Sequence, residues 1–177
     1  MIEKILITGP PRCGKSTLIS KLIEYYTTKK NYIIYGFLTP EVRKDGNRVG
    51  FDVVDIYSGN ISHLARVGDF KTTYRVGKYN VFIEEFDKYI EDKFSLKGKT
   101  IDLYVIDEIG KMELFSRKFQ TFIKTIFTSK IPILATLGLK LNHPLKKYLL
   151  NLPSVLLLNL DRRNSQLTFE KVISLIP

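Results

Sequence analysis

The sequence KILITGPPRCGKST at residues 4–17 decides the fold of this chain. Its first part, Lys4–Thr8, is an apolar run of strand length, and the apolar residues of Thr17–Tyr26 recur at the spacing of one helix face. The segment between them, Gly9–Ser16, is rich in glycine and proline, which favours a loop. The stretch therefore predicts a strand, a tight loop and a helix that begins where the loop ends.

A loop of this kind can hold an anion, because free backbone N–H groups and the positive end of the helix point to the same place. Gly9–Ser16 contains the complete pattern G-x-x-x-x-G-K-[S/T], which in this context predicts a phosphate-binding loop. Lys15 would carry a positive charge to the β- and γ-phosphates, Ser16 would offer its hydroxyl to Mg²⁺, and Thr17 would lie beside the α-phosphate. The residues expected to contact the nucleotide are Gly9, Pro10, Pro11, Arg12, Cys13, Gly14, Lys15, Ser16 and Thr17.

A second feature is the pair of acids at the end of the apolar run Leu103–Glu108. Ligands of an α/β sheet bind beyond the carboxyl ends of its strands, where the phosphate loop also lies. Asp107 is therefore expected to hold Mg²⁺ through its water shell, and Glu108 to orient or deprotonate the water that attacks the γ-phosphorus. An acid pair that merely ends a strand is the alternative; a complete phosphate loop earlier in the chain favours the catalytic interpretation. Lys111 and Glu113 follow closely enough to reach the same site.

The rest of the chain alternates apolar runs of strand length with segments of helical period, which predicts an α/β fold of three layers with a mainly parallel sheet. The Asp45-Gly46 turn and the alternation across residues 49–53 predict an antiparallel hairpin, followed by a strand at Ile61–Arg66. With no repeat or linker, we expect a single domain over residues 1–177. The remaining expected elements are strands at Ile33–Leu38, Ile101–Ile106, Ile131–Thr136 and Val155–Leu160, and helices over Phe82–Ile90, over Phe119–Phe127 and from about Phe169.

The composition limits the class of protein. The chain has 177 residues, of which 44% are hydrophobic, which suits one α/β domain. The one cysteine, Cys13, excludes an internal disulfide and fits a cytoplasmic protein, and no apolar run is long enough to cross a membrane. His63 and His143 show no metal-ligand spacing. The net charge of +10 would attract polyanions such as nucleic acid, but the basic residues are dispersed, which favours a lysine-rich surface.

Two longer segments resemble a known family. Asp107–Leu114, with the sequence DEIGKMEL, is similar to a signature of the small nucleoside-triphosphatase family known from thermophiles and as the cancer-related nucleoside-triphosphatase. Gly36–Arg43 (GFLTPEVR) and Val49–Asp52 (VGFD) resemble its second signature. The order of the segments and the chain length agree as well. The resemblance implies a RecA-like P-loop core and slow, Mg²⁺-dependent hydrolysis of ATP, GTP and other nucleotides, with poor base discrimination.

The resemblance also assigns individual residues. Arg43 matches the arginine after the second signature, where it would stabilise transferred charge or lie on a hairpin surface. Arg163 aligns with an arginine near the C-terminus, although Arg162 stands where the family has asparagine. Thr136, after Ala135, matches a hydroxyl that could sense the γ-phosphate. Arg12 replaces a common glycine and would reach the nucleotide or face solvent. Four residues match without departure: Lys15, Ser16, Asp107 and Glu108.

Two rival functions fit the same motifs. A nucleotide or polynucleotide kinase would use the same phosphate loop but needs an acceptor pocket and usually a mobile lid, and no arginine-rich lid segment is apparent. A nucleic-acid-binding ATPase switch would need a basic face with interleaved aromatics, for which Tyr25-Tyr26, Lys29-Lys30 and Tyr32 are a weak match. The carboxylate of Glu108 favours water as the acceptor, and hence hydrolysis. The pattern leaves the preferred nucleotide and the oligomeric state open.

Overall fold

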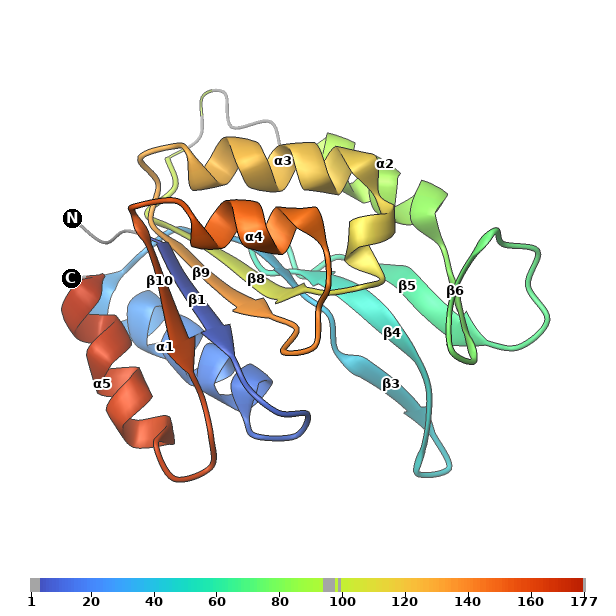
Figure 1. Cartoon of the computed structure of the whole chain (residues 1–177), viewed down its shortest axis with the longest axis horizontal. Coiled ribbons are helices and arrows are strands. Elements are labelled where there is room, and N and C mark those ends of the chain that lie inside the picture. The colour runs from blue at the N-terminus through green and yellow to red at the C-terminus, as the bar shows by residue number, and fades with distance from the viewer. Residues whose placement is uncertain (1–3, 94–97, 99, 177) are drawn as a thin grey trace.

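The computed structural model describes residues 4–93, 98 and 100–176, and its central element is a twisted sheet (Figure 1). Within these residues the strand order is β10-β1-β9-β8-β2-β4-β5-β7-β6, with β3 paired to β4. The strands are β1 (Lys4–Thr8), β2 (Ile34–Leu38), β3 (Glu41–Lys44), β4 (Asn47–Asp55), β5 (Ile61–Val67), β6 (Tyr74–Val76), β7 (Tyr79–Val81), β8 (Leu103–Ile109), β9 (Ile133–Leu137) and β10 (Val155–Asn159). The helices are α1 (Lys15–Lys30), α2 (Ile83–Lys93), α3 (Arg117–Phe127), α4 (Pro144–Leu150) and α5 (Ser165–Leu175), with a 3₁₀ turn η1 (Glu113–Phe115).

The sheet has a parallel half and an antiparallel half. Strands β10, β1, β9, β8 and β2 run parallel to one another, whereas β4, β5, β7 and β6 extend the sheet in antiparallel pairs. The carboxyl ends of the parallel strands therefore meet at one edge of the sheet. The predicted three-layer α/β fold with an antiparallel addition is confirmed, and the addition is larger than the predicted hairpin.

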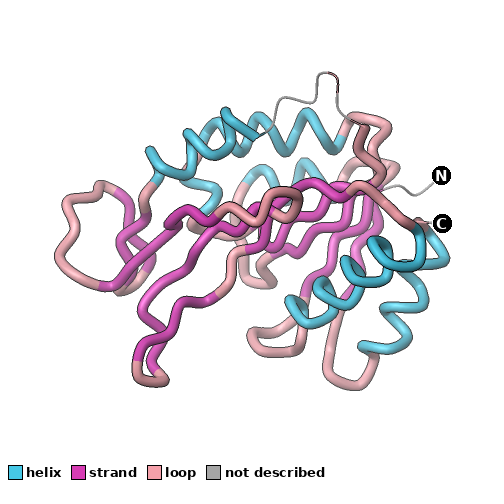
Figure 2. Tube along the Cα trace, turned by 180° about the vertical axis from the view of Figure 1, so that it is seen from behind, coloured by secondary structure: helices cyan, strands magenta, loops and turns pink. Residues whose placement is uncertain are grey.

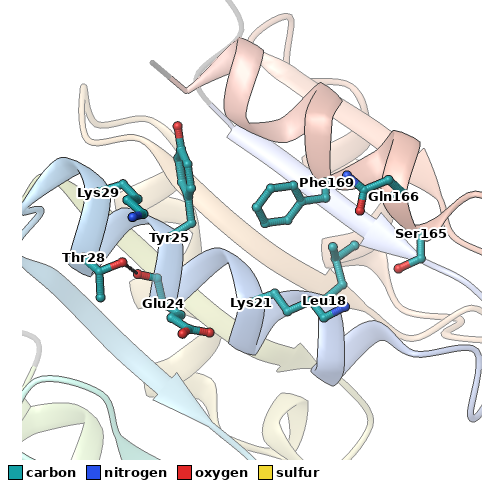
Figure 3. A pocket seen from close by; sticks show the side chains of 9 residues that line it. All are labelled: Leu18, Lys21, Glu24, Tyr25, Thr28, Lys29, Ser165, Gln166 and Phe169. Atoms are coloured by element: carbon teal, nitrogen blue, oxygen red, sulfur yellow. Dashed lines mark hydrogen bonds between the residues drawn. The ribbon is translucent and has the colours of Figure 1, made fainter.

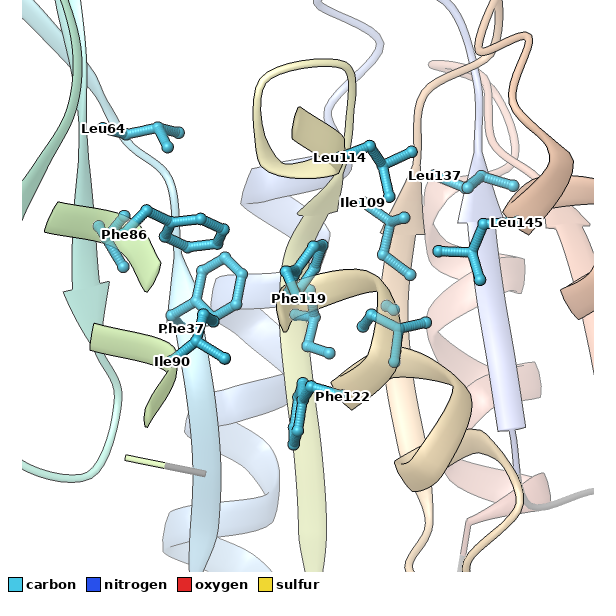
Figure 4. Packing of buried hydrophobic residues seen from close by; sticks show 14 of the residues in the cluster. Phe37, Leu64, Phe86, Ile90, Ile109, Leu114, Phe119, Phe122, Leu137 and Leu145 are labelled. Atoms are coloured by element: carbon cyan, nitrogen blue, oxygen red, sulfur yellow. The ribbon is translucent and has the colours of Figure 1, made fainter. Parts of the chain in front are cut away.

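Helices cover both faces of the sheet. Helices α1 and α5 lie on one face and α2, α3 and α4 on the other, as the view from behind makes clear (Figure 2). Alternation along β1 explains the two layers, because Ile5 and Ile7 pack under α1 and α5 while Leu6 packs on the opposite side. The larger cluster joins the sheet to α2, α3 and α4 through aromatic residues such as Phe37, Phe86 and Phe119, all fully buried (Figure 4).

Several boundaries differ from the sequence prediction. Helix α1 begins at Lys15 and α5 at Ser165, both earlier than expected, while β8 and β9 begin and end later. The β6–β7 pair and α4 were not predicted, because strands of three residues and a helix of seven are too short to show a period. Helix α4 is fixed by its ends: Pro144 opens it, and His143 Nδ1 accepts a hydrogen bond from the N–H of Leu145 at 3.1 Å.

In the part of the chain that the structure describes, every helix is too short or too polar to cross a lipid bilayer.

Candidate functional site

The phosphate loop connects β1 to α1 at the carboxyl edge of the sheet. Arg12 and Gly14 take left-handed backbone conformations, with φ of 61° and 104°, which turn the chain back into the helix. Lys15 is the first helical residue, and its Nζ donates hydrogen bonds to the carbonyl oxygens of Gly9 (2.9 Å) and Pro10 (3.1 Å). No side chain caps the beginning of α1, and its first turn holds no acid. The N–H groups of this turn, beside the exposed Ser16, therefore remain open to an anion.

The connection between β10 and α5 supports the phosphate loop from the side. The N–H of Leu160 donates to the carbonyl oxygen of Thr8 at 2.7 Å, which continues the pairing of β1 with β10. A Cβ on Gly9 would lie 2.3 Å from the carbonyl oxygen of Leu160 and 2.8 Å from Sγ of Cys13, so only glycine fits there. The Cys13 thiol is buried against this contact.

Asp107 lies near the end of β8 and is held by two threonines. Its Oδ1 accepts a hydrogen bond from Oγ1 of Thr136 on β9. Its carbonyl oxygen accepts from the N–H (2.6 Å) and the hydroxyl (2.8 Å) of Thr39, which follows β2. Asp107 is only 7% exposed. Thr136 on β9 holds its side chain, and Thr39, which follows β2, holds its backbone. The sequence pattern assigns Thr39 no role, because only the pairing of Leu38 with Asp107 places Thr39 beside the acid.

Glu108 and Glu113 form a second acidic group next to Asp107. A Cβ on Gly110 would lie 2.7 Å from both Oε1 of Glu108 and Oε2 of Glu113, so the two carboxyl groups converge on this glycine. Burial and then the charge of Asp107 raise the pKa of Glu108, while Lys15 acts in the opposite direction. Burial, followed by the charge of Glu108, raises the pKa of Glu113 to about 8. Lys15 thus lies close enough to Glu108 to influence its charge, which joins the acids to the phosphate loop.

The donor set suits a magnesium ion. The described residues contain no cluster of three or more His, Cys, Asp or Glu side chains that could hold a metal by themselves. Mg²⁺ needs no such cage, because it keeps several waters and binds through one or two protein oxygens together with substrate phosphates. The anchored carboxylate of Asp107 and the exposed hydroxyl of Ser16 are oxygen donors of this kind. The residues therefore fit a metal that arrives with the nucleotide.

The three predicted arginines differ in whether their side chains have hydrogen-bond partners. Arg43, on β3, donates to Glu41 Oε2 (2.6 Å) and to the carbonyl oxygen of Gly46 (2.9 Å), so its guanidinium is held on the hairpin surface. Arg163 lies in the turn after β10, where its N–H donates to Oδ1 of Asp161 at 2.6 Å. Among the described residues its side chain makes no hydrogen bond or ion pair. Arg12 is exposed at the tip of the phosphate loop.

Two pockets flank the site without containing it. One, of about 280 Å³, lies between α1 and α5 and is lined by Leu18, Tyr25 and Phe169 among others (Figure 3). The other, of about 470 Å³, is lined by the basic side chains of Arg75 and Lys111, by His143 and by apolar side chains between them. Neither is lined by Gly9–Thr17 or by the acid pair. The phosphate loop is an open cradle of backbone groups at the sheet edge.

Comparison with known proteins identifies the family to which the chain belongs. The sequence matches the family described as NTPase over residues 4–173. It is 44% identical to nucleoside-triphosphatase THEP1 of Archaeoglobus fulgidus over 142 residues, which cover 80% of this chain and 81% of that protein. The crystal structure of THEP1 from the hyperthermophile Aquifex aeolicus is similar, with a TM-score of 0.80 and 32% identity over 98% of each chain. The solution structure of a human cancer-related nucleoside triphosphatase has a TM-score of 0.81 and 32% identity, covering 97% of this chain and 96% of that one.

Proposed function

The chain belongs to the NTPase family and is a nucleoside-triphosphate hydrolase, and we propose that it converts ATP, GTP and related nucleotides to the diphosphate and phosphate with Mg²⁺ and little base discrimination. The observation that carries the proposal is the partly buried Glu108 carboxylate, placed where Lys15 of the phosphate loop influences it. The names of the relatives, nucleoside-triphosphatase, support the same reaction.

When the phosphate loop binds the triphosphate, Lys15 exchanges its hydrogen bonds to the loop for hydrogen bonds to the phosphates. Lys15 Nζ leaves the carbonyl oxygens of Gly9 and Pro10 for β- and γ-phosphate oxygens, which are charged acceptors and therefore stronger ones. The uncapped N–H groups of the first turn of α1 bind the same phosphates. Asp107 and Ser16 would hold the Mg²⁺. When bound, the ion neutralises phosphate charge that develops as the γ-phosphoryl group is transferred.

Glu108 activates the water. Its raised pKa makes the carboxylate a stronger base than an exposed glutamate, and Lys15 partly offsets the rise. The carboxylate takes a proton from the attacking water as the oxygen bonds to the γ-phosphorus. The bond between that phosphorus and the bridging β-phosphate oxygen then breaks, and the diphosphate leaves with the bonding electrons. Water is therefore the proposed acceptor of the γ-phosphoryl group, because the Glu108 carboxylate can take up its proton.

A phosphotransferase is the second candidate, and the basic pocket beside η1 is the observation that favours it. Arg75, Lys111 and His143 line a volume of about 470 Å³ that could hold an anionic acceptor. Such an enzyme would move the γ-phosphoryl group to the acceptor and leave little free phosphate.

The proposal is tested by the products formed from ATP, GTP, CTP and UTP, with Mg²⁺ and after its removal by EDTA. We expect equal amounts of diphosphate and free phosphate from each nucleotide, at comparable rates. Turnover should stop with EDTA and return when Mg²⁺ is added. A rate that is unaffected by EDTA would contradict the metal dependence, and phosphate recovered only on an added nucleoside monophosphate would favour the phosphotransferase.

Arg163, rather than Arg43, is expected to stabilise the transferred charge. The Arg43 guanidinium is already bound to Glu41 and Gly46. Arg163 instead follows Leu160, whose carbonyl oxygen lies against Gly9, and among the described residues its side chain makes no hydrogen bond or ion pair. Because an arginine in this role supplies roughly 10³- to 10⁵-fold in turnover, Arg163→Ala should lower kcat by about 10³-fold or more. Arg43→Ala serves as the matched variant and should change kcat far less. The assay is phosphate release at saturating ATP; the reverse order of effects would assign the role to Arg43.

A further inference from the structure

The carboxyl group of Glu113 has no part in the reaction described above, yet it is buried within the site. Glu113 is 3% exposed and opens the 3₁₀ turn η1, five residues beyond Glu108. Burying a carboxyl group is costly unless it has partners or carries a proton. Here its partners are the N–H groups of Gly110 and of Glu113 itself. A purely structural position of this kind would be filled more easily by an apolar side chain.

This carboxyl group and that of Glu108 lie close to each other beside Gly110. Both carboxyl oxygens lie 2.7 Å from the point that a Cβ of residue 110 would occupy, so neither glutamate can move toward Gly110 without approaching the other. A backbone hydrogen bond fixes the turn that carries Glu113: the N–H of Leu114 donates to the carbonyl oxygen of Gly110 at 3.1 Å. Behind it, Ser116 caps α3 by accepting from the N–H of Phe119 at 2.9 Å. Glu113 is therefore the rigid member of the pair, and Glu108, at the end of a strand, is the member that it can restrain.

We propose that Glu113 is a positioning residue for Glu108: its buried carboxyl group, which meets Glu108 at Gly110, fixes where the Glu108 carboxylate lies relative to the phosphate loop. The inference rests on the proposed role of Glu108 as the base that activates water. It assigns Gly110 a function as well, since any larger residue at position 110 would push both carboxyl groups out of place.

The protonation of Glu113 is consistent with this role. With a pKa raised to about 8, Glu113 is mostly uncharged at neutral pH and stands next to Glu108 without repelling it. Several charged groups surround η1. Asp107 and Glu108 lie on β8, and Asp87 of α2 accepts a hydrogen bond from the Ser116 hydroxyl. Arg75 and Lys111 line the pocket beside η1, and Arg117 and Lys118 of α3 are exposed. Above about pH 8 Glu113 ionises, and the second negative charge drives the Glu108 carboxylate away from its position.

Three substitutions at residue 113 test the proposal, with kcat, nucleotide affinity and a pH profile as readouts. Glu113→Ala removes the restraint and should lower kcat roughly 10- to 100-fold, a part of what a general base contributes. The Kd for a fluorescent ATP analogue should change by less than about threefold, because the phosphate loop is untouched. Glu113→Gln has the shape of the protonated acid and should restore most of the lost turnover. Glu113→Asp, one methylene shorter, should not.

The pH profile separates positioning from a structural effect. In the parent, kcat should decline as the pH rises past about 8, and this decline should be weaker in Glu113→Gln, whose amide does not ionise. Gly110→Ala should resemble Glu113→Ala in kcat. Glu91→Ala, an exposed glutamate paired with Lys118 on the surface, is the control and should behave as the parent.

Each remaining outcome counts against a specific statement. Parental kcat in Glu113→Ala, with Glu108→Gln impaired, would overturn the positioning role and leave the proposed function intact. Equal losses in the alanine and glutamine variants would overturn the role of the uncharged carboxyl group, provided that both melt at the parental temperature. Parental kcat in Glu108→Gln would overturn the role of Glu108 and with it this inference.

Discussion

Replacing Glu108 with glutamine is expected to lower kcat for phosphate release roughly 10²- to 10⁴-fold, the range that a general base supplies. Glutamine keeps the size of the side chain and its neighbours at Gly110 but cannot accept the proton of the attacking water. Nucleotide affinity should stay within about threefold of the parent, because the lost interaction is made only in the transition state. Removing the charge next to Asp107 also relieves a repulsion, so the variant should fold at least as stably.

The measurement is single-turnover phosphate release with saturating enzyme and Mg²⁺, combined with a titration of a fluorescent ATP analogue. Glu170→Gln, in which an exposed glutamate of α5 is changed in the same way, should keep the parental rate. If the Glu108 variant also turns over at the parental rate, another group must deprotonate the water. If it loses affinity and rate together, Glu108 contributes to binding and not to the chemical step.

Replacing Lys15 with alanine is expected to affect binding and catalysis together. The ammonium group makes charge-assisted hydrogen bonds to phosphate, each worth about 1.5–3 kcal/mol, so the affinity for ATP should fall roughly 10- to 100-fold. Turnover should fall further, because the same charge opposes the negative charge of the transferred group, and kcat/KM should drop roughly 10³-fold or more. The loss of its bonds to Gly9 and Pro10 also frees the loop itself.

Thermal unfolding with and without ATP and Mg²⁺ is the direct test of the binding part. The parent should be stabilised by the nucleotide, since a ligand that binds only the folded state raises its stability, whereas Lys15→Ala should show little shift at the same concentration. Lys21→Ala, six residues further along α1 and exposed, is the matched control and should respond as the parent. Parental affinity in Lys15→Ala would mean that the triphosphate is bound elsewhere.

The parts of the site that could be predicted from the sequence are those that depend on neighbours along the chain. The phosphate loop requires only a strand, a glycine-rich turn and a helix in succession, and Gly9–Ser16 has all the residue types that this needs. The acid pair is equally local, because Asp107 and Glu108 end an apolar run. Both are found where the prediction placed them, at the carboxyl edge of the parallel strands.

The parts that could not be predicted depend on the register between strands. Thr39 and Thr136 anchor Asp107 only because β2 and β9 flank β8 in the sheet, and strand order is not written in any local pattern. The burial of Glu113 is a similar case, since a glutamate in a polar-looking turn gives no sign that its carboxyl group faces the interior. Arg43 illustrates a different difficulty. Its match to the family signature did not reveal that its guanidinium is already bound to Glu41, two residues earlier.

The pairing of β1 also has a consequence for how the protein is made. The strand that opens the phosphate loop pairs on one side with β9 and on the other with β10, whose residues follow it by more than a hundred positions. During synthesis the loop motif leaves the ribosome before both strands, so β1 lacks β9 until Leu137 has emerged and β10 until Asn159 has emerged. A nascent chain thus carries the whole nucleotide-binding motif before the sheet that supports the loop can be completed.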